Sequence, residues 1–151
     1  MTTIQTANID HLPAIVALLA DDPLGSARET ASTIITQPYL RAFEEIQQDP
    51  NAQILVALND QKVVACLQLN VLANLTFTGA KRALIEGVRV DKAMQGFGIG
   101  RQIFDAAIAI SKEQGCVMVQ LTTNNARPDA AKFYQKLGFV GSHTGFKMLL
   151  K

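Results

Sequence analysis

The sequence predicts a mixed α/β fold in a single domain that spans residues 1–151. Two observations carry this prediction. Apolar segments of strand length alternate with amphipathic segments of helix length along the whole chain. A glycine-rich turn, Gly96-Phe97-Gly98-Ile99-Gly100, joins one of the apolar segments to one of the amphipathic ones. A chain of this length fits one domain, which buries about 70% of the surface of the unfolded chain.

Proline, glycine, asparagine and aspartate divide the first half of the chain into a strand, two helical regions and a hairpin. Asn8 or Asp10 caps the first helix, and the second helical region is interrupted near Pro38. The expected elements are a strand over Thr3–Ala7, a helix with Leu12, Ile15, Val16 and Leu19 on its inner face, a helical region from about Arg28 to Gln48, and strands Gln53–Leu58 and Lys62–Val71 around Asn59-Asp60-Gln61.

The second half of the chain alternates strands and helices. Ile99, Ile103, Phe104, Ala107 and Ile110 recur at helical spacing after the glycine-rich turn. The expected elements are strand Lys81–Val90, a helix from the turn to about Gln114, strand Cys116–Leu121, a helix that begins at Pro128, and strands near Phe139–Ser142 and Phe146–Leu150.

Composition excludes several classes of partner. Hydrophobic residues make up 48% and charged residues 18% of the chain, and the net charge of +1 gives no reason to expect nucleic acid or an anionic membrane. No apolar run is long enough to span a membrane and no signal peptide is evident, so the cytoplasm is the expected location. Cys66 and Cys116 lie in apolar strand patterns typical of reduced core thiols, and His11 and His143 are too scattered for a metal site.

The glycine-rich turn predicts an anion site. A helix that starts there presents unpaired backbone N–H groups and the positive end of its dipole, and glycine leaves room for a close ligand. A phosphate-bearing cofactor is therefore expected, and a tight turn without a ligand is the alternative. Arg101 and Gln102 stand where nucleotide hydrolases have Lys and then Ser or Thr. The G-x-G-x-G spacing and its late position also differ from the dinucleotide fingerprint.

Two motifs together resemble the GCN5-related N-acetyltransferase (GNAT) superfamily. Val88-Arg89-Val90 followed by Gln95–Gly100 is similar to its acetyl-coenzyme A (acetyl-CoA) signature, a hydrophobic strand and then Arg/Gln-x-x-Gly-x-Gly/Ala at the start of a helix. Ala130–Phe139 is similar to the second element of the family, and one strand separates the two motifs, as in the family. The resemblance implies a central mixed, mainly antiparallel sheet of six to seven strands, flanked by about four helices.

The resemblance implies acetyl-CoA as the cofactor. In the family, the pyrophosphate lies on the backbone of the glycine-rich turn, and the pantetheine arm pairs with the preceding strand where that strand parts from the next one. Gly87 indicates a β-bulge at that point. A glycine that the strand tolerates for packing reasons alone is an equal alternative. Arg127 replaces a family asparagine, so Asn124, or Asn125, is the candidate for that contact. The residues expected to bind the cofactor are Val88, Arg89, Val90, Gln95, Gly96, Phe97, Gly98, Ile99, Gly100, Arg101 and Asn124.

Transfer of acetyl to an amine calls for a base. An amine with a pKa of about 10.4 is almost fully protonated at pH 7, and freeing its lone pair costs about 4.6 kcal/mol. Glu86, an acid within an apolar strand, is the candidate, directly or through water, because some family members carry a glutamate on this strand. Pairing with Arg82 or Arg127, or simple exposure at a sheet edge, is the alternative.

The departing thiolate calls for an acid. Tyr134 occupies the position of the family tyrosine that protonates it, and a core aromatic beside Phe133 and Leu137 is the alternative. The expected activity is acetyl-CoA-dependent N-acetylation of a primary amine of a small molecule by direct attack in a ternary complex. The alternative is a non-catalytic acyl-CoA-binding sensor or scaffold of the same fold. Many family members dimerise, but the sequence fixes no interface.

The acceptor is less well defined. The family's acceptor wall points to the first two helices, their loop and the tail around His143. Asp21 and Asp22 fit either a cationic amine or a solvated loop, and Arg28 fits a carboxylate. The sequence does not choose among amino acids, polyamines, aminosugars and peptides as acceptors.

Overall fold

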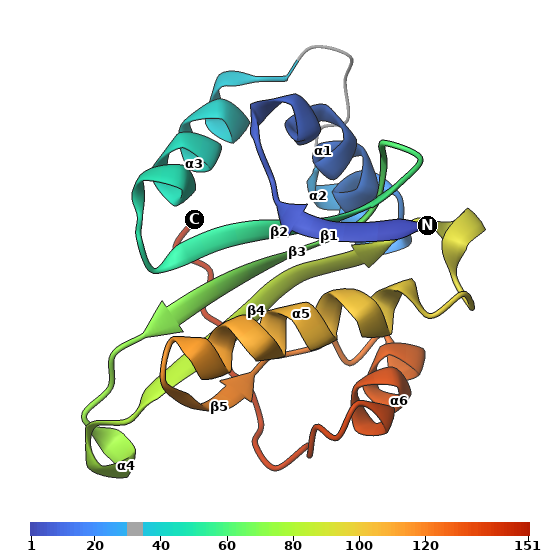
Figure 1. Cartoon of the computed structure of the whole chain (residues 1–151). Coiled ribbons are helices and arrows are strands. Elements are labelled where there is room, and N and C mark those ends of the chain that lie inside the picture. The colour runs from blue at the N-terminus through green and yellow to red at the C-terminus, as the bar shows by residue number, and fades with distance from the viewer. Residues whose placement is uncertain (30–34) are drawn as a thin grey trace. The chain divides into compact units, whose positions relative to one another are not determined.

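The computed structural model describes residues 1–29 and 35–151, which form two compact units, Met1–Gln120 and Leu121–Lys151 (Figure 1). No helix in these described ranges is both long and apolar enough to cross a membrane. The first unit contains β1 (Thr2–Thr6), η1 (Ile9–His11), α1 (Leu12–Ala20), α2 (Pro23–Arg28), α3 (Gln37–Gln48), β2 (Ala52–Asn59), β3 (Lys62–Leu72), α4 (Thr76–Gly79), β4 (Lys81–Val90), η2 (Lys92–Met94), α5 (Ile99–Glu113) and β5 (Cys116–Gln120), and the second contains α6 (Pro128–Lys136).

The first unit is built on a mixed sheet with the strand order β1-β2-β3-β4-β5. The strands β1 to β4 pair antiparallel, and β5 runs parallel to β4. The predicted mixed α/β architecture is confirmed. The predicted count of six to seven strands is wrong for the described residues, because Phe139–Ser142 and Phe146–Leu150 form no strand.

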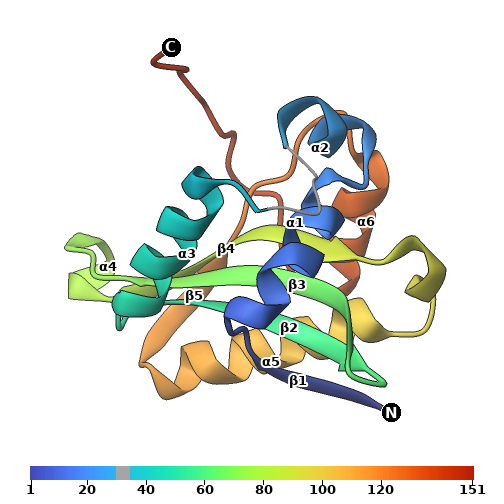
Figure 2. The ribbon, with the colours of Figure 1, turned by 90° about the horizontal axis from the view of Figure 1, so that it is seen from above.

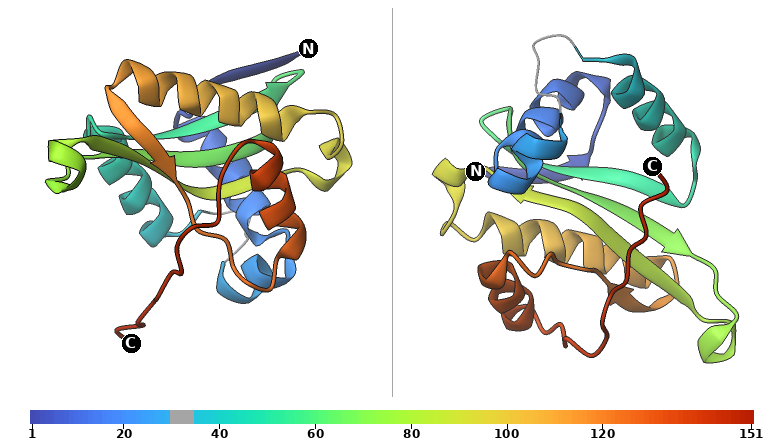
Figure 3. Two further views of the ribbon diagram at one scale, coloured as in Figure 1. Left: turned by 90° about the horizontal axis from the view of Figure 1, so that it is seen from below. Right: turned by 180° about the vertical axis from the view of Figure 1, so that it is seen from behind.

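Helices cover both faces of this sheet. The long helix α5 contacts all five strands on one face, whereas α1 packs on β3 and β4, and α3 packs on β2, on the opposite face (Figures 2 and 3). Among the described residues there are six α-helical segments rather than about four, because the short α2 and α4, of six and four residues, were not anticipated.

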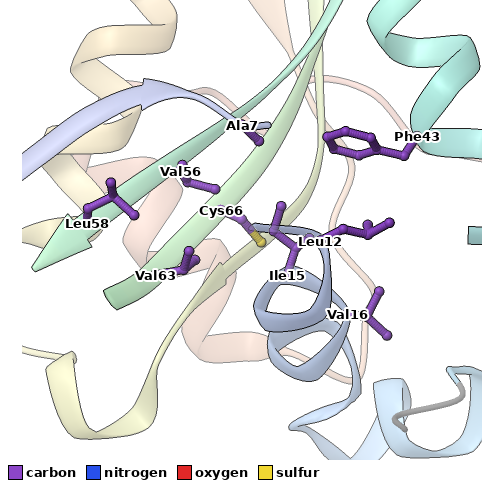
Figure 4. Packing of buried hydrophobic residues seen from close by; sticks show 9 residues of the cluster. All are labelled: Ala7, Leu12, Ile15, Val16, Phe43, Val56, Leu58, Val63 and Cys66. Carbon is purple, nitrogen blue, oxygen red and sulfur yellow. The ribbon is translucent and has the colours of Figure 1, made fainter. Parts of the chain in front are cut away.

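The core on the α1 side joins two helices, α1 and α3, with two strands, β2 and β3 (Figure 4). Val56 and Leu58 of β2 belong to it, so Leu55 and Ala57 point to the α5 face because side chains alternate along a strand. The buried stripe of α5 consists of Ile99, Ile103, Phe104, Ala107 and Ser111, close to the predicted helical spacing. The core on the α1 side consists of Ala7, Leu12, Ile15, Val16, Phe43, Val56, Leu58, Val63 and Cys66.

The chain starts its helices where the capping chemistry places them. Asn8, and not Asp10, begins the first helical segment: its side chain accepts the N–H of Asp10 at 3.0 Å, and its own N–H donates to Nδ1 of His11 at 3.1 Å. The predicted interruption near Pro38 is confirmed: Ile35 and Thr36 are not helical, and Pro38 lies in the first turn of α3, where a missing N–H breaks no helical bond. Of the predicted helical region from about Arg28 to Gln48, the structure forms α3 from Gln37 onward, Arg28 is the last residue of α2, and residues 30–34 lie outside the described residues.

The second unit contains α6, which ends in a Schellman motif. Phe139 donates its N–H to the carbonyl of Tyr134 at 3.0 Å, and Gly138 donates to that of Gln135 at 3.0 Å. Gly138 has a φ of 102°, which a residue with a Cβ adopts only under strain. The rings of Tyr134 and Phe139 meet edge-on at 6.1 Å, which is the apolar contact typical of this motif.

Candidate functional site

A bulge in β4 shapes the centre of the first unit. Across from β3, Cys66 pairs with Arg89 and Gln68 pairs with Glu86, so β4 has one residue more than β3 between these pairs. Gly87 sits at this point with a φ of 63°, which confirms the bulge interpretation of this glycine. Because Cys66 and Gln68 lie two residues apart on one face of the sheet, the bulge places Glu86 and Arg89 on that same face. A regular strand would separate them onto opposite faces.

The same strand parts from β5. Pairing between β4 and β5 runs only from Lys81 with Cys116 to Leu84 with Gln120. Within the first unit, Val88, Arg89 and Val90 therefore have no β5 residue beside them on that edge, although Arg89 and Val90 still pair with β3 on the other edge. Within the first unit, the backbone of this segment therefore has one edge without a strand partner, which is the geometry that an extended ligand pairs with.

The glycine-rich turn between β4 and α5 has the backbone geometry of an anion cradle. Gly96 and Gly98 have φ values of 86° and 80°, and a Cβ built on either would meet no atom within 4 Å. The first helical hydrogen bond of α5 runs from the N–H of Gln102 to the carbonyl of Gly98 at 3.1 Å. The N–H groups of the turn and of the first helical turn precede this bond and have no helical acceptor. Open space and unpaired donors fit a pyrophosphate group.

A short 3-10 turn, which the sequence did not reveal, leads into this cradle. In η2, the side chain of Asp91 accepts the N–H of Ala93 at 2.9 Å, and Gln95 donates from Nε2 to the carbonyl of Val90 at 3.3 Å. The Asp-x-Ala spacing of this Asx turn was the signal available in the sequence. Gln95 thus uses its side chain to hold the turn against the end of β4.

Two ion pairs connect the loop between α1 and α2 with β4 and η2. Arg89 Nε lies 2.8 Å from Asp22 Oδ2, and each side chain is only 15% exposed. Lys92 Nζ lies 3.2 Å from Asp21 Oδ1, and these side chains are 64% and 55% exposed. Sequence reasoning treated the two aspartates as one acidic pair. The structure gives each its own cation, and no spacing signal in the sequence pointed to partners about 70 residues away.

Asp22 also caps the N-terminus of α2. Its Oδ1 accepts the N–H of Gly25 and so caps α2, while its Oδ2 faces Arg89. Arg89 also donates from Nη1 to the carbonyl of Val88 at 2.8 Å. One carboxylate therefore fixes both the start of α2 and the side chain that follows the bulge.

Glu86 is exposed, on the α1 face of the sheet opposite Gln68. The predicted alternative of an ion pair with Arg82 is not formed: Arg82 donates to Gln120 Oε1 at 3.2 Å and to Thr76 Oγ1 at 2.7 Å. Exposure leaves the carboxylate accessible to solvent and to a ligand.

Cys66 lies beneath the bulge. Its thiol is buried and donates to the carbonyl of Gly87 across 3.7 Å. Burial raises the pKa of this thiol to about 12, while the nearby Arg89 acts in the opposite direction. Both cysteines are free thiols, as predicted, but Cys116 is only half-buried. In the parts of the chain that the structure describes, no cluster of three or more His, Cys, Asp or Glu side chains is placed to hold a metal ion.

Two predicted site residues belong to the second unit. Tyr134 is half-buried, and the centroid of its ring lies 5.5 Å from the ring centroid of Phe133. It lies in the last turn of α6, which the Schellman motif ends. Asn124 is exposed, and its Oδ1 accepts the N–H of Ala126 at 2.9 Å in an Asx turn ahead of α6. His143, also exposed, has Nδ1 2.6 Å from Oγ of Ser142.

A family model described as the Acetyltransferase (GNAT) family matches residues 14–139, which is most of the chain. The chain belongs to the GNAT family. Acetyltransferases of this family use acetyl-CoA. This GNAT chain is 30% identical over 117 residues to the aminoalkylphosphonate N-acetyltransferase of Salmonella typhimurium, covering 76% of this chain and 73% of that protein.

Two solved structures extend the comparison. A protein from Bacillus halodurans described as a transcriptional regulator is 45% identical, with a TM-score of 0.97 over 99% of this chain and 100% of the other. Glucosamine-6-phosphate N-acetyltransferase from Arabidopsis thaliana is 22% identical, with a TM-score of 0.80 over 100% and 99% of the two chains, and shares the fold. The GNAT fold is thus common to relatives with different described roles.

Proposed function

We propose that this GNAT protein is an acetyl-CoA-dependent N-acetyltransferase that acetylates the primary amine of a small molecule by direct attack in a ternary complex. The observation that carries the proposal is the edge of β4, whose pairing with β5 stops at Leu84 and which leads directly into the glycine-rich turn. An extended strand edge followed by an anion cradle fits a cofactor with an amide-bearing arm and a pyrophosphate. The family match continues past Gln120 into the second unit, which supports one catalytic domain over residues 1–151.

The cofactor would be held mainly by backbone groups. When bound, acetyl-CoA supplies the acetyl group as a reactive thioester. The backbone of Val88, Arg89 and Val90 would pair with the pantetheine amides, and Asn124 would contribute a side-chain contact. The N–H groups that would receive the pyrophosphate belong to Gln95, Gly96, Phe97, Gly98, Ile99, Gly100 and Arg101.

Glu86 is proposed as the base. Its carboxylate is exposed, it makes none of the ion pairs found in the described residues, and it shares a face with Arg89 because of the bulge. An accessible carboxylate can take the proton from an acceptor ammonium at Oε1 or Oε2, directly or through one water. That transfer supplies the lone pair that an acceptor amine lacks at neutral pH.

Tyr134 is proposed as the acid. The ring of this side chain packs against those of Phe133 and Phe139 within its own unit, with centroids 5.5 Å and 6.1 Å away. A tyrosine held in one orientation can keep the proton on Oη in place for the departing sulfur. The aromatic contacts also fit the alternative of a purely structural tyrosine, so the variant described below decides between them.

The proposed acceptor is a small amine. The curated relative of Salmonella typhimurium is named for an aminoalkylphosphonate, an amine that carries an acidic group, and this supports including such compounds. Asp22 already neutralises Arg89, which argues against that arginine as a free anchor for the acidic group. The exposed Arg28 remains available for that role.

The test is release of free thiol from acetyl-CoA across a panel of amines: aminoalkylphosphonates, amino acids, polyamines, aminosugars and short peptides. We expect release with at least one small amine. Tyr134→Phe should lower kcat by about 10²–10⁴-fold with little change in acetyl-CoA affinity. Gly98→Glu should abolish that affinity, because a charged side chain enters the cradle. Unchanged turnover in Tyr134→Phe would remove its role as the acid.

A non-catalytic sensor of acyl-CoA is the second candidate. The relative from Bacillus halodurans, at 45% identity, is described as a transcriptional regulator, and this observation favours it. A sensor would bind acetyl-CoA at the glycine-rich turn yet release no thiol with any amine. Calorimetric binding with wild-type protein and with Gly98→Glu, run beside the thiol assay, separates the two functions.

A further inference from the structure

Two amide side chains interrupt the apolar pattern of the central strand. β3 is the third of five strands, and its α1 face carries Cys66, Gln68 and Asn70 in turn, because side chains alternate along a strand. Cys66 is buried in the core on the α1 side, whereas Gln68 and Asn70 are half-buried. Withdrawing a polar group from water costs free energy unless the group finds a hydrogen-bond partner. We call Gln68 and Asn70 the amide pair.

The amide pair satisfies only half of its own hydrogen-bonding groups. Nε2 of Gln68 donates to Oδ1 of Asn70 at 2.9 Å. Within residues 1–29 and 35–151, Oε1 of Gln68 and Nδ2 of Asn70 have no further partner in the protein. Turning both amides over would exchange the two roles but would still leave one acceptor and one donor. An acceptor and a donor therefore stand side by side on this face of the sheet.

The amide pair lies beside the proposed base. Glu86 of β4 pairs with Gln68 of β3, and both side chains lie on the α1 face. Residues that face each other directly across an antiparallel pair have Cβ atoms about 4.5–5.5 Å apart. An amine that gives its proton to Glu86 therefore brings its neighbouring substituents next to the amide pair.

The chemistry of the amide pair selects a hydroxyl group. A hydroxyl both donates and accepts, so one such group can use Oε1 of Gln68 and Nδ2 of Asn70 together. A second ammonium group could use only the acceptor, and an alkyl group could use neither. A carboxylate or phosphonate could use only the donor and would be repelled by the carboxylate of Glu86. Arg89 does not offset that repulsion, because Asp22 already neutralises it.

We infer that the amide pair binds a hydroxyl group next to the reacting amine, so that the acceptor is an amino alcohol and Gln68 and Asn70 determine specificity. The inference rests on the proposed function, because it takes Glu86 as the group that receives the proton of the amine. A site built to bond a hydroxyl discriminates strongly against the analogue that lacks it, since its own polar groups are then left unpaired.

Kinetics with matched amines are the first test. 2-Aminoethanol with ethylamine, and trans-2-aminocyclohexanol with cyclohexylamine, are pairs that differ by one hydroxyl. We expect kcat/KM to be about 10–10²-fold higher for the hydroxylated member. Gln68→Leu and Asn70→Leu should raise KM for the amino alcohols alone. The control is Gln53→Leu, which removes an amide from β2 opposite Leu69, on the other face, and should keep the preference. A wild-type protein without preference, or variants that change both members equally, overturns the inference.

Binding without turnover separates this inference from the proposed transfer. The side-chain amide resonances of Gln68 and Asn70, assigned through the two leucine variants, are followed by NMR in protein saturated with CoA. trans-2-Aminocyclohexanol should shift both resonances, and cyclohexylamine at the same concentration should shift neither. Such shifts without thiol release in the amine panel would keep the hydroxyl site and remove the proposed transfer. Thiol release accompanied by equal shifts, or by none, would overturn the inference and leave the transfer intact.

Discussion

Neutralising Asp22 is the sharpest test of how the bulge in β4 is held. Asp22→Asn keeps a side-chain oxygen to cap α2 but removes the charge that faces Arg89 at 2.8 Å. At an effective dielectric constant of about 20, unit charges 4 Å apart attract by about 4 kcal/mol before desolvation is subtracted. Exposed ion pairs contribute a net stabilisation of about 0–1 kcal/mol, and breaking a buried ion pair lowers the free energy of unfolding by about 3–5 kcal/mol.

For side chains that are 15% exposed, we expect Asp22→Asn to lower the free energy of unfolding by about 2 kcal/mol. Asp22→Ala should cost about 1 kcal/mol more, because it also removes the cap on α2. The control is Asp21→Asn, whose ion pair with Lys92 is more than half exposed and should contribute at most about 0.5 kcal/mol.

The assay is urea unfolding of the single variants and of a double-mutant cycle with Arg89→Met. The cycle should give a coupling free energy of about 1–2 kcal/mol between Asp22 and Arg89. A coupling indistinguishable from zero, or an equal loss in Asp21→Asn, would refute the argument that burial makes this one pair strong.

Three further predictions follow from backbone geometry and burial. Gly25→Ala should destabilise the protein by about 1–3 kcal/mol in urea unfolding, because a methyl group there overlaps the carbonyl oxygen of Leu19; Gly141→Ala, where a Cβ meets nothing within 4 Å, should change little. Gly138→Ala should cost about 1–2 kcal/mol through its φ of 102°, and an unchanged unfolding midpoint would contradict the Schellman assignment. Burial raises the pKa of the Cys66 thiol from 9.0 to about 12, so the unfolded state loses this proton at a lower pH than the folded state. The stabilisation from the buried neutral thiol is therefore complete below pH 9, and the free energy of unfolding falls between pH 9 and 12 by about 1.4 kcal/mol per pH unit. Cys66→Ala should reduce the slope of the free energy of unfolding against pH by that amount, and equal slopes in wild-type and variant protein would contradict this prediction.

The local chemistry of the sequence was sufficient for the elements that carry the site. The strand Lys81–Val90 was predicted with its observed bounds, and the helix after the glycine-rich turn ends within one residue of the prediction. Gly87 indicated a bulge as one of two equal alternatives, and the strand register decided for the bulge. The residue that caps the first helical segment was harder to predict from the sequence. Asn8 and Asp10 are both residue types that cap helices, and only the hydrogen bonds of the structure distinguish them.

By itself, then, the sequence determined the mixed α/β class, the hairpin, the glycine-rich turn and the family to which the chain belongs, since these depend on periodicity and on short-range backbone preferences. Only the tertiary structure decided that Asp22 faces Arg89 and that Glu86 shares a face with Arg89. Such relations depend on strand register and on contacts between residues far apart in the chain, which no local pattern encodes. The strands predicted after Phe139 failed for a related reason. A strand pattern states a preference, but a strand exists only where a neighbouring edge supplies its hydrogen bonds.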